Sequence, residues 1–125
     1  MEDRGMTLDE YQHGAMSTRM DTCDNQVYMI SLLTEEVGEV AGKVSKAVRK
    51  DLLTFDENVA VWNGSGDSYA EWLEGVVLEL GDVLWAVAGL ASSFDVPLSR
   101  VASGNLEKLA SRKRRGVIDG MGDDR

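Results

Sequence analysis

The sequence contains very little of three residue types on which many folds and sites depend. Its 125 residues include one cysteine, Cys23, one proline, Pro97, and one histidine, His13. A single cysteine excludes an internal disulfide. A single histidine excludes a dinuclear iron or manganese bundle, because such a bundle needs two Glu-x-x-His pairs. The scarcity of proline and of strand-like alternation favours an all-α fold.

Positive charge is also scarce, and this restricts the partners. Thirteen Lys and Arg against 22 Asp and Glu give a net charge of -9, the wrong sign for binding polymeric nucleic acid. The first twenty residues carry charges throughout instead of an apolar signal segment,. The apolar run 76–91 is interrupted by Glu79 and Asp82 and is too short to span a bilayer. We therefore expect a cytoplasmic protein without a membrane segment.

The length and a hydrophobic content of 43% suit one domain over residues 1–125,. Thr7 with Glu10 forms a capping box that predicts a first helix over about 8–20. Asp24 or Thr22 can cap a second helix, whose apolar residues recur at helical spacing to about Lys50,. Four main helices are expected in total.

The other two helices follow a break in the pattern. Periodicity is lost over 51–67, which predicts a loop-rich insertion in which a short helical turn at 58–62 is one option. Ser68 with Glu71 forms a second capping box and predicts a third helix to about Ser93. Pro97 fits the first turn of a fourth helix that Gly116 can end, and an irregular tail is expected over 116–125.

Two carboxylate pairs carry the chemistry. Glu36 and Glu39 are three residues apart on the second helix, as are Glu79 and Asp82 on the third. Because an i,i+3 pair differs by only about 60° around a helix, each pair projects from one face. Two such helices side by side would offer four carboxylates to one point. Carboxylate oxygens suit Mg²⁺ or Mn²⁺.

The simpler interpretation is that helical carboxylates face water, as most do. Here the neighbours argue against it, because Glu79 and Asp82 are the only charges in the apolar segment 76–87. A helix that is apolar on nearly every side is buried, and burying two unpaired carboxylates costs several kcal/mol each. A bound cation would remove that cost.

Basic residues follow the carboxylates on the second helix and recur on the fourth helix. Lys43, Lys46 and Lys50 follow the carboxylates of the second helix, where an ion pair from Glu39 to Lys43 with solvated lysines is favoured over a phosphate-binding role. The fourth helix places four donors on one face in an otherwise acidic chain, and that face suits a polyphosphate: Asn105, Lys108, Arg112 and Arg115. A solvated basic C-terminal half, favoured by the helix dipole, is the alternative.

The ordered motifs resemble a known family. Thr34-Glu35-Glu36-Val37-Gly38-Glu39 followed by Glu79-Leu80-Gly81-Asp82 is similar to the EExxE and ExxD signature of the MazG-like all-alpha nucleotide pyrophosphohydrolases. The downstream segment from Asn105 to Arg112 and the ending from Arg115 resemble the C-terminal pattern of that family. The resemblance covers nearly the whole chain outside 51–67. The gap from Glu39 to Glu79 is longer than is usual in the family, which bears on the nucleobase pocket more than on the metal site.

The resemblance implies a function and a division of roles. A nucleoside triphosphate would be cut to the monophosphate and pyrophosphate with Mg²⁺ or Mn²⁺, by attack of water on the α-phosphorus. The metal ligands would be Glu36, Glu39, Glu79 and Asp82, and the phosphate contacts Asn105, Lys108 and Arg112. Glu35 or another carboxylate would position the water. From the residues alone, Glu35 can be an outer-sphere base, a ligand for another metal, or a solvated carboxylate. The resemblance also implies a homodimer or homotetramer.

Two alternatives stay open from the sequence. A non-catalytic helical interaction or oligomerisation module explains the apolar stripes, but it gives no reason for Glu79 and Asp82. Aromatic and amide side chains suit a nucleobase, which makes Trp62, Tyr11 and Gln12 candidate base contacts. Core packing for Trp62 and a surface role for Gln12 are the simpler interpretations.

Overall fold

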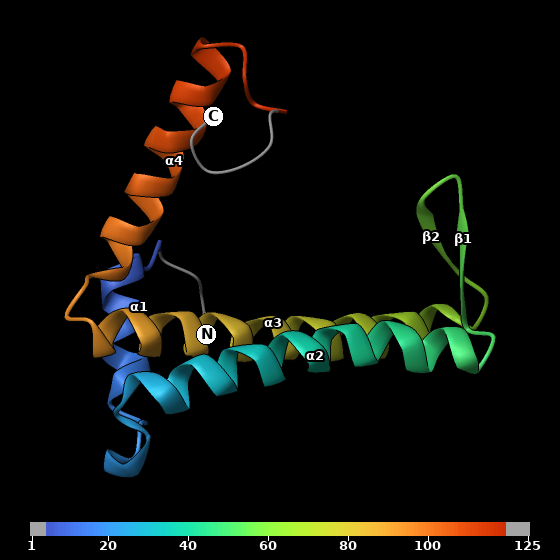
Figure 1. Cartoon of the computed structure of the whole chain (residues 1–125). Coiled ribbons are helices and arrows are strands. Elements are labelled where there is room, and N and C mark those ends of the chain that lie inside the picture. The colour runs from blue at the N-terminus through green and yellow to red at the C-terminus, as the bar shows by residue number, and fades with distance from the viewer. Residues whose placement is uncertain (1–4, 120–125) are drawn as a thin grey trace.

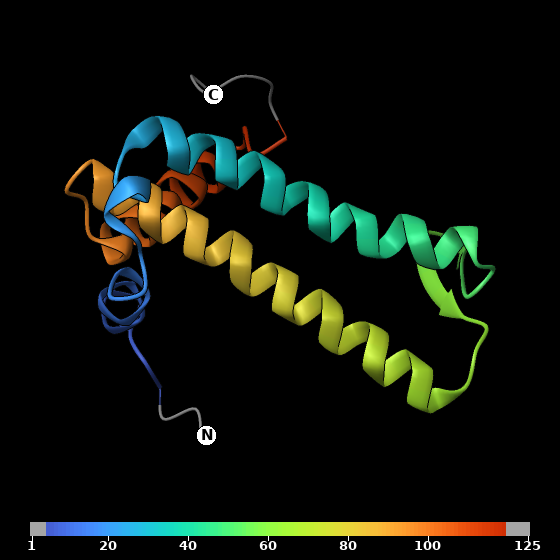
Figure 2. The same ribbon diagram turned by 90° about the horizontal axis from the view of Figure 1, so that it is seen from below.

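The computed structural model describes residues 5–119 and is helical apart from one β-hairpin. Two long antiparallel helices, α2 (Gln26–Arg49) and α3 (Gly66–Ser93), run side by side (Figures 1 and 2). At one end they are joined by β1 (Leu53–Asp56) and β2 (Val59–Trp62). At the other end lie α1 (Leu8–Met16), the short 3-10 helix η1 (Asp21–Cys23) and α4 (Leu98–Arg114). The predicted all-α class with four main helices is confirmed.

The helix starts follow local capping chemistry, and two of them differ from the prediction. The capping box of Thr7 and Glu10 is present. Helix α2 is capped by Asn25, whose side chain accepts from the Tyr28 N–H at 2.8 Å, and not by Asp24 or Thr22. Ser65 caps α3 by accepting from the Ser68 N–H, so α3 begins before the predicted capping box.

The first helix is shorter than predicted because hydroxyl side chains at its C-terminal end bond to the preceding turn. It ends at Met16 instead of continuing to residue 20. The hydroxyls of Ser17 and Thr18 donate to the carbonyls of Gly14 and Ala15, which is the competition with the helix that short hydroxyl side chains offer. The chain therefore turns early into the connector that leads to α2.

Residues 53–62 form an antiparallel hairpin, so the helical turn predicted at 58–62 is wrong and the insertion is not a plain loop. The strands pair from Leu53 opposite Trp62 to Asp56 opposite Val59. Glu57 and Asn58 both have positive φ, 46° and 70°, as a two-residue type I′ turn requires. Asn is one of the residues that tolerates this conformation, and the β-branched residues beside it favour strands.

The seam between α2 and α3 follows a heptad spacing on both helices. The half-buried or buried residues of α2 along it are Met29, Leu33, Glu36, Val40, Lys43 and Ala47. The facing residues of α3 recur at the same four- and three-residue steps, and are Trp72, Gly75, Glu79, Asp82, Ala86 and Gly89. A four-three alternation keeps one stripe facing the partner helix. The seam has apolar and mostly small residues at its α1 end and charged residues in its middle.

The tightest packing lies at the α1 end of the seam. Met29 and Ala86 are fully buried, and a Cβ on Gly89 would collide with the Met29 thioether. Trp85 ties α1 to this region by donating to the Ala15 carbonyl at 3.2 Å. This packing fixes the register of α2 on α3, and so the places of the polar residues farther along.

α3 also meets the length and composition criteria for a membrane-crossing helix, the one element to do so within residues 5–119. Those two criteria are also met by the central helix of a water-soluble bundle. One face of α3 packs on α2, and Glu79 and Asp82 lie in its middle. Packing on α2 and the two mid-helix carboxylates agree better with a bundle helix than with a lipid-facing one.

Gln12 joins α1 to the start of α4. Its amide nitrogen donates to the Ser92 hydroxyl at 3.0 Å and to the Val96 carbonyl at 3.1 Å, and its amide oxygen accepts from the Leu98 N–H at 2.8 Å. Asp9, on the same face, accepts from the Ser99 N–H and hydroxyl. These bonds satisfy two of the free N–H groups of the first turn of α4, those of Leu98 and Ser99,.

Gln12→Ala should therefore destabilise the fold by about 1–3 kcal/mol, because the N–H of Leu98, a residue only 3% exposed, would lose its acceptor. The measurement is urea denaturation followed by circular dichroism. His13→Ala is the matched control, since His13 is exposed on the same helix, and its effect should stay within about 0.5 kcal/mol. Equal stability of the two variants would refute this structural role of Gln12.

Candidate metal centre

Three of the four predicted metal ligands meet at the middle of the seam. Glu36 from α2 and Glu79 and Asp82 from α3 each offer a carboxylate oxygen, and these oxygens lie within 4.8 Å of one another. Glu36 and Glu79 are half-buried, and Asp82 is exposed. The site is therefore formed between two helices and is open on one side.

Glu39 lies beside this cluster but outside the group of three. The seam of α2 runs from Glu36 to Val40, a four-residue step, so Glu39 is rotated toward solvent and is exposed,. Its charge still contributes to raising the pKa of Glu36. Glu39 thus lies near the cluster but does not belong to the group of three.

The electrostatics of the cluster are those of crowded negative charge. The pKa of Glu36 is raised above its usual value, first by burial and then by the charges of neighbouring carboxylates, of which Asp82 has the largest effect and Glu35, Glu79 and Glu39 follow. Burial and then the charge of Asp82 raise the pKa of Tyr11. Helix α1, which carries Tyr11, therefore lies on the Asp82 side of the cluster.

One cation reaches the cluster, and it is not paired as predicted. The Lys43 ammonium lies 4.0 Å from Glu79 Oε1, whereas no ion pair joins Lys43 to Glu39 within residues 5–119. Lys43 is seven residues after Glu36 and so shares its stripe on the seam. The predicted Glu39–Lys43 pair is wrong because the neighbouring helix supplies a nearer carboxylate.

The donor set fits a hard divalent cation. Three carboxylates converge with one ammonium at the outer limit of an ion pair, which leaves an excess of negative charge in a partly desolvated seam. Such repulsion is relieved either by protonation or by a cation. Oxygen ligands at this spacing, with one side open to water and phosphate, are what Mg²⁺ and Mn²⁺ take.

The other predicted site residues are not brought to the cluster within one copy. Helix α4 extends away from the α2–α3 pair (Figure 1). Asn105 and Lys108 on it are exposed, and Arg112 is 4% exposed. Glu35 is exposed next to Glu36 and raises its pKa. The predicted phosphate contacts and the carboxylates therefore lie on different parts of one molecule.

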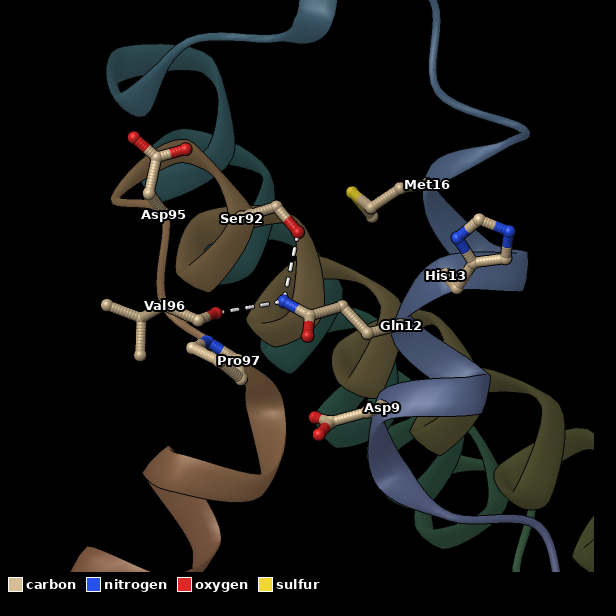
Figure 3. Close-up of a pocket in the computed structure, with 8 residues that line it drawn as sticks. All are labelled: Asp9, Gln12, His13, Met16, Ser92, Asp95, Val96 and Pro97. Carbon is tan, nitrogen blue, oxygen red and sulfur yellow. Dashed lines mark hydrogen bonds between the residues drawn. The ribbon is translucent and has the colours of Figure 1, made fainter.

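The candidate base contacts have separate structural partners. Gln12 crosses a hollow of about 580 Å³ at the junction of α1, α3 and α4 to reach Ser92 and Val96 (Figure 3). None of the residues lining that hollow belongs to the carboxylate cluster. Trp62 stacks on Trp72 with ring centroids 5.4 Å apart. Tyr11 alone of the three lies near the carboxylates.

Comparison with known proteins agrees with the helical fold. The model of a family described as the MazG nucleotide pyrophosphohydrolase domain matches residues 25–117. The Gene 37 protein of Mycobacterium phage L5 is 40% identical over 128 residues, which is 96% of this chain and 100% of the phage protein. No solved structure matches the chain at a significant level.

Mg²⁺ or Mn²⁺ should raise the melting temperature of the wild type, since a ligand at a hundred times its Kd stabilises the folded state by about 2.7 kcal/mol. Asp82→Asn should remove this response. Without metal the variant should be as stable as the wild type or more so, because one of three repelling charges is gone. Differential scanning fluorimetry with and without metal measures both effects.

Glu74→Gln is the matched control, because Glu74 is an exposed carboxylate on the same helix. It should keep the wild-type response to metal. A full metal response in Asp82→Asn would rule out the carboxylate cluster as the binding site.

Proposed function

Because the chain belongs to the MazG nucleotide pyrophosphohydrolase family, we propose that it hydrolyses a nucleoside triphosphate, a dNTP or an NTP, to the monophosphate and pyrophosphate. The metal would be Mg²⁺ or Mn²⁺, held by Glu36, Glu39, Glu79 and Asp82. The observation that carries the proposal is the meeting of three carboxylates from two helices within 4.8 Å. Nucleoside triphosphates abound in the cytoplasm, and we expect the protein to act there.

Each group in the site has a chemical task in this reaction. A bound divalent cation supplies charge neutralisation for the phosphates and lowers the pKa of water. Glu35, exposed beside the cluster, takes the proton of the attacking water. Glu36 and Glu79 hold their carboxylates in the seam by helix packing, so the site needs little rearrangement to bind a cation.

The alternative function is a non-catalytic helical interaction or oligomerisation module. The exposed apolar surface agrees with it. That surface gives no role to a repelling carboxylate cluster in the centre of the seam, which an interaction module would lose without harm. We therefore rank hydrolysis first.

A panel of nucleoside triphosphates with Mg²⁺ should yield monophosphate and pyrophosphate for at least one member. In H₂¹⁸O, the label should appear in one of the two products, as attack of solvent water on a phosphoryl centre requires. Mass spectrometry of the products measures both. Glu79→Gln should abolish turnover while Glu74→Gln retains it, and release of orthophosphate with a diphosphate would disprove the assigned cleavage.

We further propose that a second copy completes the molecule, as a homodimer or as part of a homotetramer. Large apolar side chains stay exposed on three helices of one copy, including Val37 at 52%, Leu78 at 63%, Leu80 at 51% and Leu106 at 68%. Apolar surface of this extent on a small chain is typical of an interface. A partner copy is also the means by which Asn105, Lys108 and Arg112 would approach the carboxylates, since α4 extends away from its own seam.

Lys108→Ala tests the phosphate-binding role of α4. A donor that grips phosphates in the transition state should lower kcat/KM by roughly ten- to a thousand-fold when removed. Mg²⁺ affinity without nucleotide should not change, because Lys108 is not a ligand. Lys113→Ala, an exposed cation on the same helix, is the control. Sedimentation velocity establishes that both variants keep the oligomeric state, and wild-type kinetics in Lys108→Ala would contradict the role.

A further inference from the structure

The position of Lys43 is set by three features of the seam. Its backbone carbonyl accepts the Trp72 indole N–H at 3.0 Å, which fixes this turn of α2 on α3. Its side chain then crosses α3 at Gly75, where an added Cβ would lie 3.2 Å from the ammonium and 3.5 Å from the carbon next to it. The ammonium ends 4.0 Å from Glu79 Oε1. The absent side chain of Gly75 thus leaves room for the Lys43 ammonium, which a Cβ there would crowd, at the edge of the cluster.

Stability alone does not account for this arrangement. The Lys43 side chain is 37% exposed and the distance to Glu79 is at the limit of an ion pair. A pair of this kind contributes little to stability. Glycine inside a helix is less favourable than alanine by a similarly small amount, so the presence of glycine at position 75 offsets what the pair contributes.

We propose that the Lys43 ammonium binds the pyrophosphate leaving group of the hydrolysis, an inference that rests on the proposed function. In that step the oxygen of the attacking water forms a bond to the α-phosphorus, and the bond from that phosphorus to the bridging oxygen breaks. The electron pair stays on the bridging oxygen, so negative charge accumulates on the pyrophosphate. The ammonium keeps its own proton and donates a charge-assisted hydrogen bond to this group. The proton of the water passes to Glu35, as in the proposed function.

The same geometry gives the substrate a direction. Lys43 and Gly75 lie on the hairpin side of Glu79, and Tyr11 lies on the Asp82 side, where α1 is. The polyphosphate end therefore points toward the hairpin and the nucleoside end toward α1. The favoured interpretation from the sequence, an internal pair within α2, left Lys43 without a role in the reaction.

The test is calorimetric titration of the protein with inorganic pyrophosphate in the presence of Mg²⁺. This measurement needs no turnover. Lys43→Met should bind pyrophosphate about ten- to a hundred-fold more weakly, the loss expected for one hydrogen bond to a charged group. A nucleoside monophosphate should bind as in the wild type. Mg²⁺ alone should bind equally or more tightly, because no ammonium competes for Glu79. Lys46→Met, an exposed lysine three residues along α2, should match the wild type throughout.

Gly75→Ala is a second variant that keeps every charge. Alanine favours the helix, so the fold is retained. Its methyl carbon would lie 3.2 Å from the present position of the Lys43 ammonium, so the ammonium must shift by a few tenths of an ångström, which should weaken pyrophosphate binding in the same selective way. Unchanged pyrophosphate affinity in Lys43→Met, or an equal loss of pyrophosphate and monophosphate, would overturn the inference. Failure of the wild type to hydrolyse any triphosphate would instead refute the proposed function.

Discussion

The close, registered packing of α2 on α3 is the constraint on which the site depends. Met29 fits against Gly89 with no room for another atom, and this contact fixes the register of the two helices near α1. From there a four-three spacing continues the seam along both helices, so that Glu36 meets Glu79 and Asp82 about two to three turns farther along,. Helix packing of this kind is rigid compared with a loop. The carboxylates are therefore held together although they repel one another.

Repulsion inside the cluster is the energetic counterpart of that packing. Burial and then the charges of neighbouring carboxylates, Asp82 first among them, raise the pKa of Glu36, and Lys43 lies at the limit of an ion pair with Glu79. A fold selected for stability alone would place apolar residues there, as it does at Ala86 and Ala88, which are fully buried. The cost of the cluster is consistent with a site that gains its stability when a cation binds.

Local sequence signals predicted the four helices and the shared face of Glu79 and Asp82, because both depend on residues a few positions apart, whereas Glu39 of the other predicted pair lies outside the group of three. The capping box at Thr7 and the i,i+3 spacing of Glu79 and Asp82 are signals of this kind. The hairpin was missed because the turn at Glu57 and Asn58 lacks the glycine that usually announces a type I′ turn. The partner of Lys43 was missed for a different reason, since the choice between Glu39 and Glu79 depends on helix register. The Gly-x-x-x-Glu spacing of Gly75 and Glu79 was visible in the sequence, but its meaning required the facing lysine.

The seam has a chemical direction that follows from where small residues are placed. At the α1 end, Gly89 and Ala86 allow the helices to approach until only Met29 fits between them. At the hairpin end, Gly75 admits a long cationic side chain, and the aromatic pair of Trp62 and Trp72 closes the seam beyond it. Between these ends lie the carboxylates, of which Glu36 and Glu79 are half-buried and Asp82 is exposed. The seam is cationic on one side of its carboxylates, at Lys43, and bordered by Tyr11 on the other side. A nucleoside polyphosphate has the same asymmetry, with negative charge at one end and a nucleoside at the other.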